Sequence, residues 1–224
     1  MIGLALAIAA KDLRAELRSR TALVTALAFA ALVLVLFEFA RDPTRLADLL
    51  LAPSAVWITG TFAATLTLGR AFSTELDHGA IDGLLLAPVP REAIFLGKWC
   101  GALAFALLVD AVVLPLAILF FNLPVSPGRA LLLLGILALA KLGFTAVGTV
   151  FSALVAKLRA RELLLPLLVL PFLVPPLVAG VQVTSRLLDG QPLADASGWL
   201  RLLLAYDVVF VVGGLLVFPR LLDE

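Results

Sequence analysis

The sequence predicts an all-α membrane protein with six transmembrane helices, built as a single membrane domain over residues 1–224. Hydrophobic residues make up 62% of the chain and charged residues only 15%, whereas a soluble domain is about half apolar and a quarter charged. The apolar residues form stretches of roughly 20 residues, each long enough to cross a lipid core of about 30 Å. The alternation of apolar and polar residues that marks a membrane β-barrel is absent from the sequence.

Residues 1–20 predict an amphipathic helix that lies on the membrane surface. An apolar start is followed by a charged half in which Leu13 and Leu17 are four residues apart. This segment is too short and too charged to span, so we expect it to lie at the interface. The charge follows the apolar run, the reverse of the order in a cleavable signal peptide. The residues assigned to the interfacial helix are Lys11, Asp12, Arg14, Glu16 and Arg18.

The six spans follow in order at about 21–40, 54–72, 94–121, 130–156, 163–183 and 199–218. Pro53 suits the first turn of the second span, and Trp57 near its start suits the membrane interface. Residues 184–198 are predicted to form a polar loop. The fifth span contains four prolines, which bend the helix and either mark a gate or are tolerated kinks; the sequence leaves both open. They are Pro166, Pro171, Pro175 and Pro176.

The segment between the second and third spans, residues 73–92, predicts a short amphipathic helix outside the membrane. Ser73 and the acidic residues after it suit a helix start. Gly79 and Gly83 break or kink the helix, and Pro88 and Pro90 end it. We therefore expect a structured loop here.

The lysines and arginines orient the chain. With the N-terminus inside, eleven of them fall on inner segments and five on outer segments, while Lys141 lies within a span. Cytoplasmic loops carry the excess of Lys and Arg in membrane proteins. Both termini are therefore predicted to be cytoplasmic.

Several classes of function are excluded by residue counts and motifs. The sequence has no glycine-rich phosphate loop followed by Lys and Ser or Thr, so we do not expect it to hydrolyse a nucleotide. We expect no Ser-His-Asp catalytic triad, because the only histidine lies in the loop at residues 73–92. One cysteine and one histidine are too few for a cysteine-based metal cluster or a site of several imidazoles, and no catalytic, cofactor-binding or metal site is assigned. Cys100 is predicted to be an inert thiol. His78 is read either as a haem ligand or proton shuttle, or as an ordinary polar loop residue. A net charge of +1 gives no reason to expect nucleic acid.

Three ionisable residues are predicted to lie inside the membrane: Asp110, Lys141 and Asp207. Asp110 and Lys141 lie at similar distances from the turn that joins the third and fourth spans, so we expect them at one depth. A charge at mid-membrane costs about 2.5–3.5 kcal/mol on insertion scales, which favours pairing or a wet cavity. Asp207 is a further candidate partner for Lys141. The group is either a polar functional site or a tie between helices.

The sequence from Arg70 to Lys98 resembles the first cytoplasmic loop of the haem exporter protein B (CcmB) family. The resemblance rests on Arg70-x-Phe72-x-x-Glu75-Leu76-x-x-Gly79, then on residues 84–88 (Leu-Leu-Leu-Ala-Pro), Pro90 and Gly97-Lys98. The charged half of residues 1–20 and the stretch Leu170-Pro171-Phe172-x-x-Pro175 are also similar to the family. Length and the six-span layout agree over essentially the whole chain.

The resemblance implies the permease subunit of a bacterial inner-membrane ATP-binding-cassette complex in cytochrome c maturation. It implies a cytoplasmic ATPase as partner, a homodimer, further maturation subunits in the membrane and a periplasmic haem chaperone. ATP would be bound by the partner, and haem would be a substrate and not a cofactor. ATP hydrolysis by the partner would drive haem export or the release of a haem-loaded chaperone. The residues that would contact the ATPase are Arg70, Phe72, Glu75, Leu76, Asp77, His78, Gly79, Gly83, Leu84, Leu86, Pro88, Arg91 and Lys98.

Two other functions stay open at this stage. A permease of the same architecture could export another substrate, such as a drug or a lipid. A non-transporting membrane scaffold is the alternative from another class, and an intramembrane enzyme is disfavoured because the three intramembrane charges are too few for hydrolysis. Close helix approach in a dimer could use Gly143 and Gly148, or Gly213 and Gly214.

Overall fold

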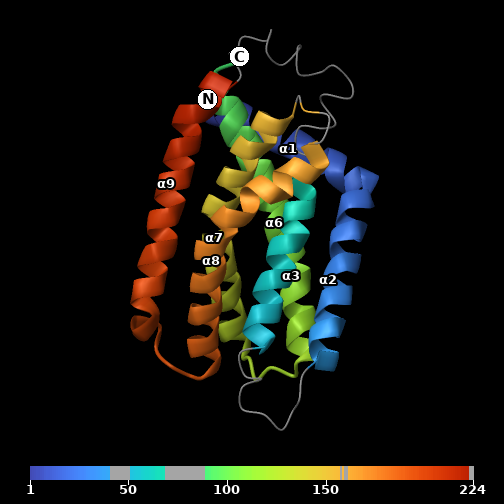
Figure 1. The fold of residues 1–224 in the computed structure, drawn as a ribbon, viewed down its shortest axis with the longest axis vertical. Coiled ribbons are helices and arrows are strands. Elements are labelled where there is room, and N and C mark those ends of the chain that lie inside the picture. The colour runs from blue at the N-terminus through green and yellow to red at the C-terminus, as the bar shows by residue number, and fades with distance from the viewer. Residues whose placement is uncertain (41–50, 69–88, 157, 159–160, 222–224) are drawn as a thin grey trace.

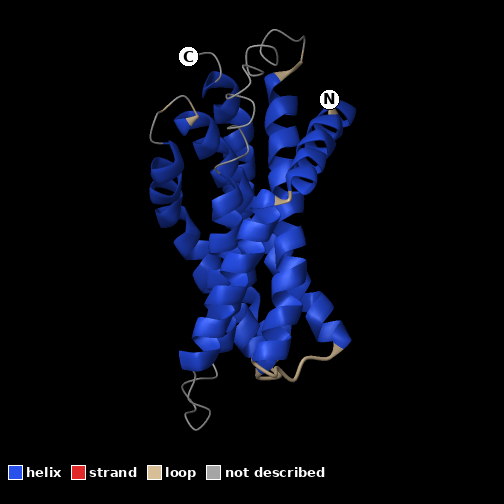
Figure 2. Cartoon of the chain, turned by 90° about the vertical axis from the view of Figure 1, so that its right-hand side faces the viewer, coloured by secondary structure: helices blue, strands red, loops and turns tan. Residues whose placement is uncertain are grey.

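The computed structural model describes residues 1–40, 51–68, 89–156, 158 and 161–221. Within these ranges every regular element is helical (Figure 2). The helices are α1 (Ile2–Ser19), α2 (Thr21–Ala40), α3 (Leu51–Leu68), α6 (Arg91–Phe120), α7 (Pro127–Val155), α8 (Arg161–Leu188), the 3-10 turn η2 (Leu193–Ala196) and α9 (Ser197–Leu221).

Five helices of the described part are long and apolar enough to cross a membrane, namely α2, α6, α7, α8 and α9. The second predicted span corresponds to α3, which is a shorter apolar helix. The predicted boundaries of the other spans lie close to the observed ones except at the end of α8. That helix continues to Leu188, so the predicted polar loop at 184–198 is wrong at its start. Thr184 and Ser185 are buried and hydrogen-bonded within the bundle, which allows the polar segment to remain helical.

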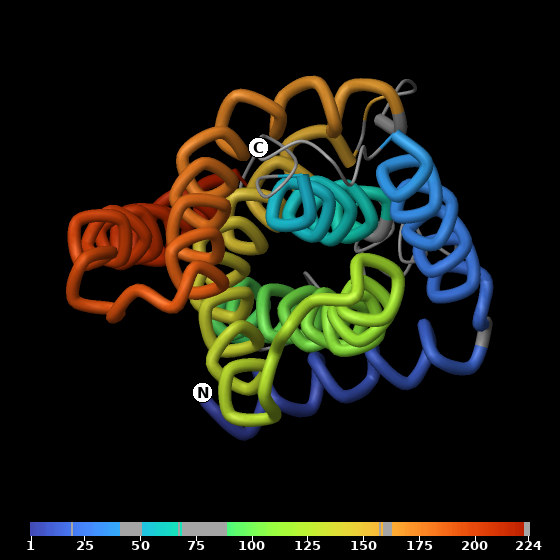
Figure 3. Tube along the Cα trace, turned by 90° about the horizontal axis from the view of Figure 1, so that it is seen from below, coloured from blue at the N-terminus to red at the C-terminus, as the bar shows by residue number. Residues whose placement is uncertain are grey.

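α3 occupies the centre of the bundle. It packs against α2, α6, α7 and α8, and the view along the bundle shows it surrounded by these helices (Figure 3). Small and polar residues suit this position, and Thr59, Thr61 and Thr65 are all buried. α2 packs against α3, buries a stripe of Ala22, Ala26, Ala30 and Leu34, and leaves its opposite, apolar face exposed.

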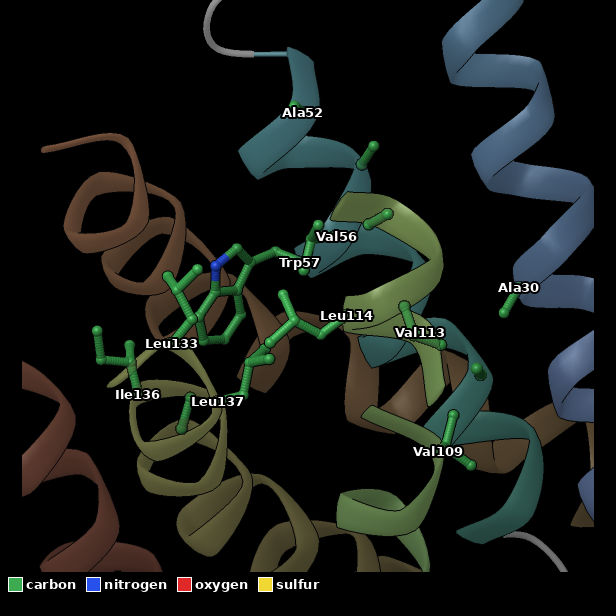
Figure 4. Close-up of a cluster of buried hydrophobic side chains, with 14 of the residues drawn as sticks. Ala30, Ala52, Val56, Trp57, Val109, Val113, Leu114, Leu133, Ile136 and Leu137 are labelled. Carbon is green, nitrogen blue, oxygen red and sulfur yellow. The ribbon is translucent and has the colours of Figure 1, made fainter. Parts of the chain in front are cut away.

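Trp57, near the start of α3, forms part of the main hydrophobic core, so its side chain faces other helices. It is 1% exposed, and its indole lies beside Leu133 and Leu137 of α7 (Figure 4). Its Nε1 donates a hydrogen bond to Thr184 Oγ1 of α8 at 2.8 Å. The ring also fills the space left by Gly180, where an added Cβ would collide with it.

The prolines of α8 do not interrupt the helix, which is continuous from Arg161 to Leu188. Pro176 has no N–H, so it leaves the carbonyl of Phe172, four residues earlier, without its usual donor. Tyr206 of α9 supplies one, since its hydroxyl donates to Phe172 O at 2.8 Å. A proline in α8 therefore provides an attachment point for α9.

α1 packs mainly against α6 and contacts α2 only at its end. Figures 1 and 2 show it tilted against the long axis of the other helices, and Figure 3 shows it lying along the outside of the bundle. Its buried face consists of Ala5, Ile8 and Ala9. Leu17, expected on the apolar face of this helix, is exposed.

Candidate coupling end and intramembrane polar cluster

One end of the bundle brings together α1, the first turns of α6 and the last turns of α3, α7 and α9. Arg91 Nη1, in the first turn of α6, donates to Pro219 O at the end of α9 at 3.3 Å. Ser152 Oγ of α7 donates to Leu68 O, the last residue of α3, at 2.9 Å. Because the last carbonyls of a helix lack intrahelical donors, such side-chain donors stabilise helix ends.

The docking of α1 on α6 depends on two glycines one turn apart. A Cβ at Gly97 would lie 2.6 Å from Ile8 Cβ and 2.9 Å from the carbonyl oxygen of Ala5. At Gly101 the nearest atoms, in Ala9 and Asp12, lie at 3.6 Å. Small residues four apart on both helices allow the two backbones to approach closely.

A buried ion pair fastens the same contact. Lys98 Nζ lies 2.9 Å from Asp12 Oδ2, and the lysine side chain is 1% exposed. Asp12 also lies 3.2 Å from Lys11 Nζ. A cavity of about 50 Å³ adjoins the pair, lined by Asp12, Leu13, Glu16, Leu68, Lys98, Gly101, Ala102 and Phe105. The pair therefore holds α1 and α6 together at the edge of the bundle.

A second polar cluster lies in the middle of the spans. Lys141 of α7 donates from Nζ to Gly60 O of α3 at 2.8 Å, and the same Nζ lies 3.6 Å from Asp110 Oδ1 of α6. Lys141 is 2% exposed and Asp110 is 1% exposed. Sequence reasoning placed Asp110 and Lys141 at one depth, and the structure brings them together as an ion pair.

Asp207 of α9 does not pair with Lys141, so that suggestion from the sequence is wrong. Its Oδ1 accepts a hydrogen bond from Gly143 N of α7 at 2.8 Å. Residues 141 and 143 lie about 200° apart around a helix, so Lys141 faces α3 and α6 while Gly143 faces α9. Gly143 therefore serves packing within the chain, against Tyr206 and Asp207.

The glycines proposed for a dimer contact are mostly used inside the chain. An added Cβ at Gly148 would meet Leu68, and one at Gly214 would meet Phe95. Gly213 is the exception among the four, because an added Cβ there would have no atom within 4 Å.

The predicted ATPase-contacting residues fall into two groups. Most lie outside the described residues: Arg70, Phe72, Glu75, Leu76, Asp77, His78, Gly79, Gly83, Leu84, Leu86 and Pro88. Arg91 and Lys98 are described, and both belong to α6. The side chain of Lys98 is buried and pairs with Asp12 of α1, a contact that the sequence did not predict. Among the interfacial residues, Lys11, Arg14 and Arg18 are exposed, whereas Asp12 and Glu16 are half-buried.

Gly60 and Gly101 were not singled out from the sequence, and Gly97 was named only as part of the family resemblance, without a packing role. The spacing Gly97-x-x-x-Gly101 opposite Ala5-x-x-x-Ala9 was the available signal for the α1 contact. Within the part of the chain that the structure describes, no group of three or more His, Cys, Asp or Glu side chains could hold a metal ion. Cys100 is a free, half-buried thiol.

Comparison with known proteins finds matches that cover nearly the whole chain. The sequence model of a protein family described as "CcmB protein" matches residues 3–220. Proteins named "Heme exporter protein B" are similar over most of their length. The one from Rhodobacter capsulatus is 32% identical over 197 residues, covering 86% of this chain and 89% of the relative. That from Pseudomonas aeruginosa is 31% identical, covering 88% and 87%, and that from Paracoccus denitrificans is 35% identical, covering 80% and 82%.

Proposed function

This chain belongs to the CcmB protein family, and we propose that it is the transmembrane subunit of an ATP-binding-cassette complex in cytochrome c maturation. A separate cytoplasmic subunit hydrolyses ATP, and the energy drives haem export or the release of a haem-loaded periplasmic chaperone. The observation that carries this proposal is the match over residues 3–220, together with whole-length relatives named as haem exporters. Haem is the substrate, and ATP is bound by the partner.

The proposed topology has six spans in the bacterial inner membrane, with both termini in the cytoplasm and α1 at the interface. α3 is the sixth span, since it lies inside the bundle of the five longer helices. The start of α1 and the last turn of α9 lie at the same end of the bundle (Figure 1). An even number of spans puts both ends of a chain on one side of the membrane, and the excess of Lys and Arg assigns that side to the cytoplasm.

The ATPase-binding element in this proposal is the segment from Arg70 to Pro88, continued by the first turn of α6. Arg91 at the start of α6 contacts α9, and Lys98 two turns later contacts α1. A force applied to the start of α6 would therefore act on three helices at once. This arrangement supports a coupling role for the segment that immediately precedes α6.

Co-purification with the ATPase subunit tests this proposal. We expect Glu75→Arg and deletion of residues 79–83 to abolish the complex and its ATPase activity, while the wild-type chain retains both. The matched control is Arg129→Glu, a charge reversal at an exposed position in the first turn of α7 at the opposite end of the bundle. A wild-type chain that never binds an ATPase, or loop variants that bind as well as the control, would refute the proposal.

A second assay separates haem handling from export of another substrate. A strain that lacks this chain should lose haem-loaded c-type cytochromes and regain them with the wild-type gene. Normal cytochromes combined with sensitivity to a drug would favour the alternative of a drug or lipid exporter. In this proposal the chain works as a homodimer with further maturation subunits. The molecular mass of the complex that co-purifies with the ATPase subunit checks this composition.

A further inference from the structure

The ammonium group of Lys141 has two acceptors on two different helices. Its hydrogen bond goes to Gly60 O on α3 at 2.8 Å, while the carboxylate of Asp110 on α6 is 3.6 Å away. A hydrogen-bonded ammonium and carboxylate are normally about 2.7–2.9 Å apart. The Lys141 ammonium therefore donates its hydrogen bond to the neutral carbonyl of Gly60, while the charged carboxylate of Asp110 lies beyond hydrogen-bonding distance.

Asp110 is left incompletely satisfied by this arrangement. Neither of its oxygens accepts a hydrogen bond within the described structure, although both are buried. A buried carboxylate without hydrogen bonds raises the free energy of the state that contains it. A shift of Lys141 Nζ by roughly 1 Å would bring it to hydrogen-bonding distance of Asp110, so a second pairing lies within a small movement of the first.

Gly60 maintains the present arrangement through its lack of a side chain. A Cβ at this position would lie 2.5 Å from Asp110 Oδ1 and 3.7 Å from Lys141 Nζ. α3 and α6 can therefore approach each other closely at this level. On its α8 side, Lys141 also borders a void of about 10 Å³, lined by Trp57, Thr61, Ala140, Lys141, Phe144, Leu173, Pro176 and Leu177. The packing around Lys141 is therefore incomplete on the side that faces α8.

We propose that Lys141 is a latch between two arrangements of the spans. In the arrangement described here it holds α3 through the Gly60 carbonyl. When α3 moves away from α6 and α7, the ammonium transfers its hydrogen bond to Asp110, so the charge stays paired throughout the movement. A structural tie would need only one stable arrangement of the three helices. The latch rests on the proposed function, because binding and hydrolysis of ATP by the partner supply the movement.

Two double variants distinguish a latch from a tie. Replacing a buried ion pair by apolar residues of similar volume is often neutral or stabilising, so Lys141→Met with Asp110→Leu should leave the fold and the ATPase complex intact. The swap Lys141→Asp with Asp110→Lys keeps an ion pair between α6 and α7 but removes the donor that α7 supplies to Gly60 O. For a latch, we expect both variants to co-purify with the ATPase and to lose at least 10-fold in haem-loaded cytochrome. Wild-type levels in either folded variant would overturn the proposal.

A labelling experiment that leaves Lys141 and Asp110 unchanged decides the question even if the double variants do not fold. Thr61→Cys places a thiol on the void beside Lys141, and Cys100→Ala makes it the only cysteine. In the complete complex, we expect a small maleimide to label it at least 5-fold faster with ATP than without nucleotide. Ala63→Cys, a fully buried position two residues further along α3 that does not line the void, is the matched control.

Equal labelling of Thr61→Cys with and without ATP would overturn the latch. Failure of the chain to bind an ATPase at all would instead refute the proposed function, so the two failures give different results.

Discussion

The contact between α1 and α6 yields the sharpest quantitative prediction, because two glycines on one helix differ only in what lies opposite them. We expect Gly97→Ala to destabilise the protein relative to Gly101→Ala. The added methyl at position 97 would lie 2.6 Å from Ile8 Cβ and 2.9 Å from the backbone oxygen of Ala5. The methyl at position 101 would have its nearest neighbours at 3.6 Å, an ordinary van der Waals distance.

The expected difference can be worked out from these distances. Two carbon atoms in contact are about 3.5–4.0 Å apart, so α1 must move outward by roughly 1 Å to accept a methyl at position 97. Overpacking of this kind typically costs about 1–3 kcal/mol. Both variants gain the same helix propensity, about 0.8–1.0 kcal/mol for alanine over glycine. That gain cancels in the comparison, so the full overpacking cost separates the two variants.

Thermal unfolding of the two variants in detergent measures this difference. For a chain of about 200 residues, 1 kcal/mol corresponds to roughly 2–4 °C in the unfolding midpoint. Gly97→Ala should therefore unfold at least about 2 °C below Gly101→Ala, while Gly101→Ala unfolds at or above the wild type. Equal midpoints, or the reverse order, would refute the reasoning that α1 is held by close backbone approach at Gly97.

Three further outcomes follow from other contacts. Tyr206→Phe removes the donor to Phe172 O and should lower the free energy of unfolding by about 0.5–1.5 kcal/mol. In a chain that also carries Pro176→Ala, this carbonyl regains its own helical donor, so the same substitution should cost less in the same unfolding assay. An unchanged cost would contradict this reasoning. Gly180→Ala places a methyl group against the ring of Trp57 and should lower the free energy of unfolding by about 1–3 kcal/mol. Gly135→Ala, where an added methyl meets no atom within 4 Å, should not destabilise the protein. Similar losses in both variants would contradict the packing argument. Lys98→Ala should lower the free energy of unfolding by about 1.5–3 kcal/mol, because it removes the ion pair with Asp12. The swap of Lys98→Asp with Asp12→Lys should restore part of that loss. A double-mutant cycle on the unfolding midpoints measures this, and a swap no more stable than Lys98→Ala would contradict the pairing.

Much of the fold could be predicted from the sequence because hydrophobic length is a strong signal in membrane proteins. α2 begins and ends where the sequence predicted, and α7 and α9 differ by a few residues at their ends. The end of α8 was missed because polarity was taken as the end of a span. The hydroxyl of Thr184 accepts a hydrogen bond from Trp57 of α3. A partner so far away in the sequence cannot be predicted from the residues next to Thr184.

The polar cluster could be predicted only in part. The pairing of Asp110 with Lys141 could be predicted, because both residues lie equally far along the chain from the turn that joins their two antiparallel helices. Which face of α7 meets which helix does not follow from depth, so Asp207 was a further candidate partner for Lys141, whereas it accepts a hydrogen bond from Gly143 N. Gly60 was not predicted because it acts through its backbone carbonyl, which every residue carries, and through a close approach to Asp110 of α6, which sequence does not show.

The central position of α3 has a consequence for biosynthesis. α3 leaves the ribosome after α2 but well before α6, α7 and α8, the helices that later surround it. Until they arrive, its buried threonines and the Gly60 carbonyl would face lipid or the insertion machinery. Three of the four neighbours of α3 are made after it, so its final placement must wait for the later half of the chain. Chains truncated after α3 should therefore be degraded, while chains that reach Leu188 should persist.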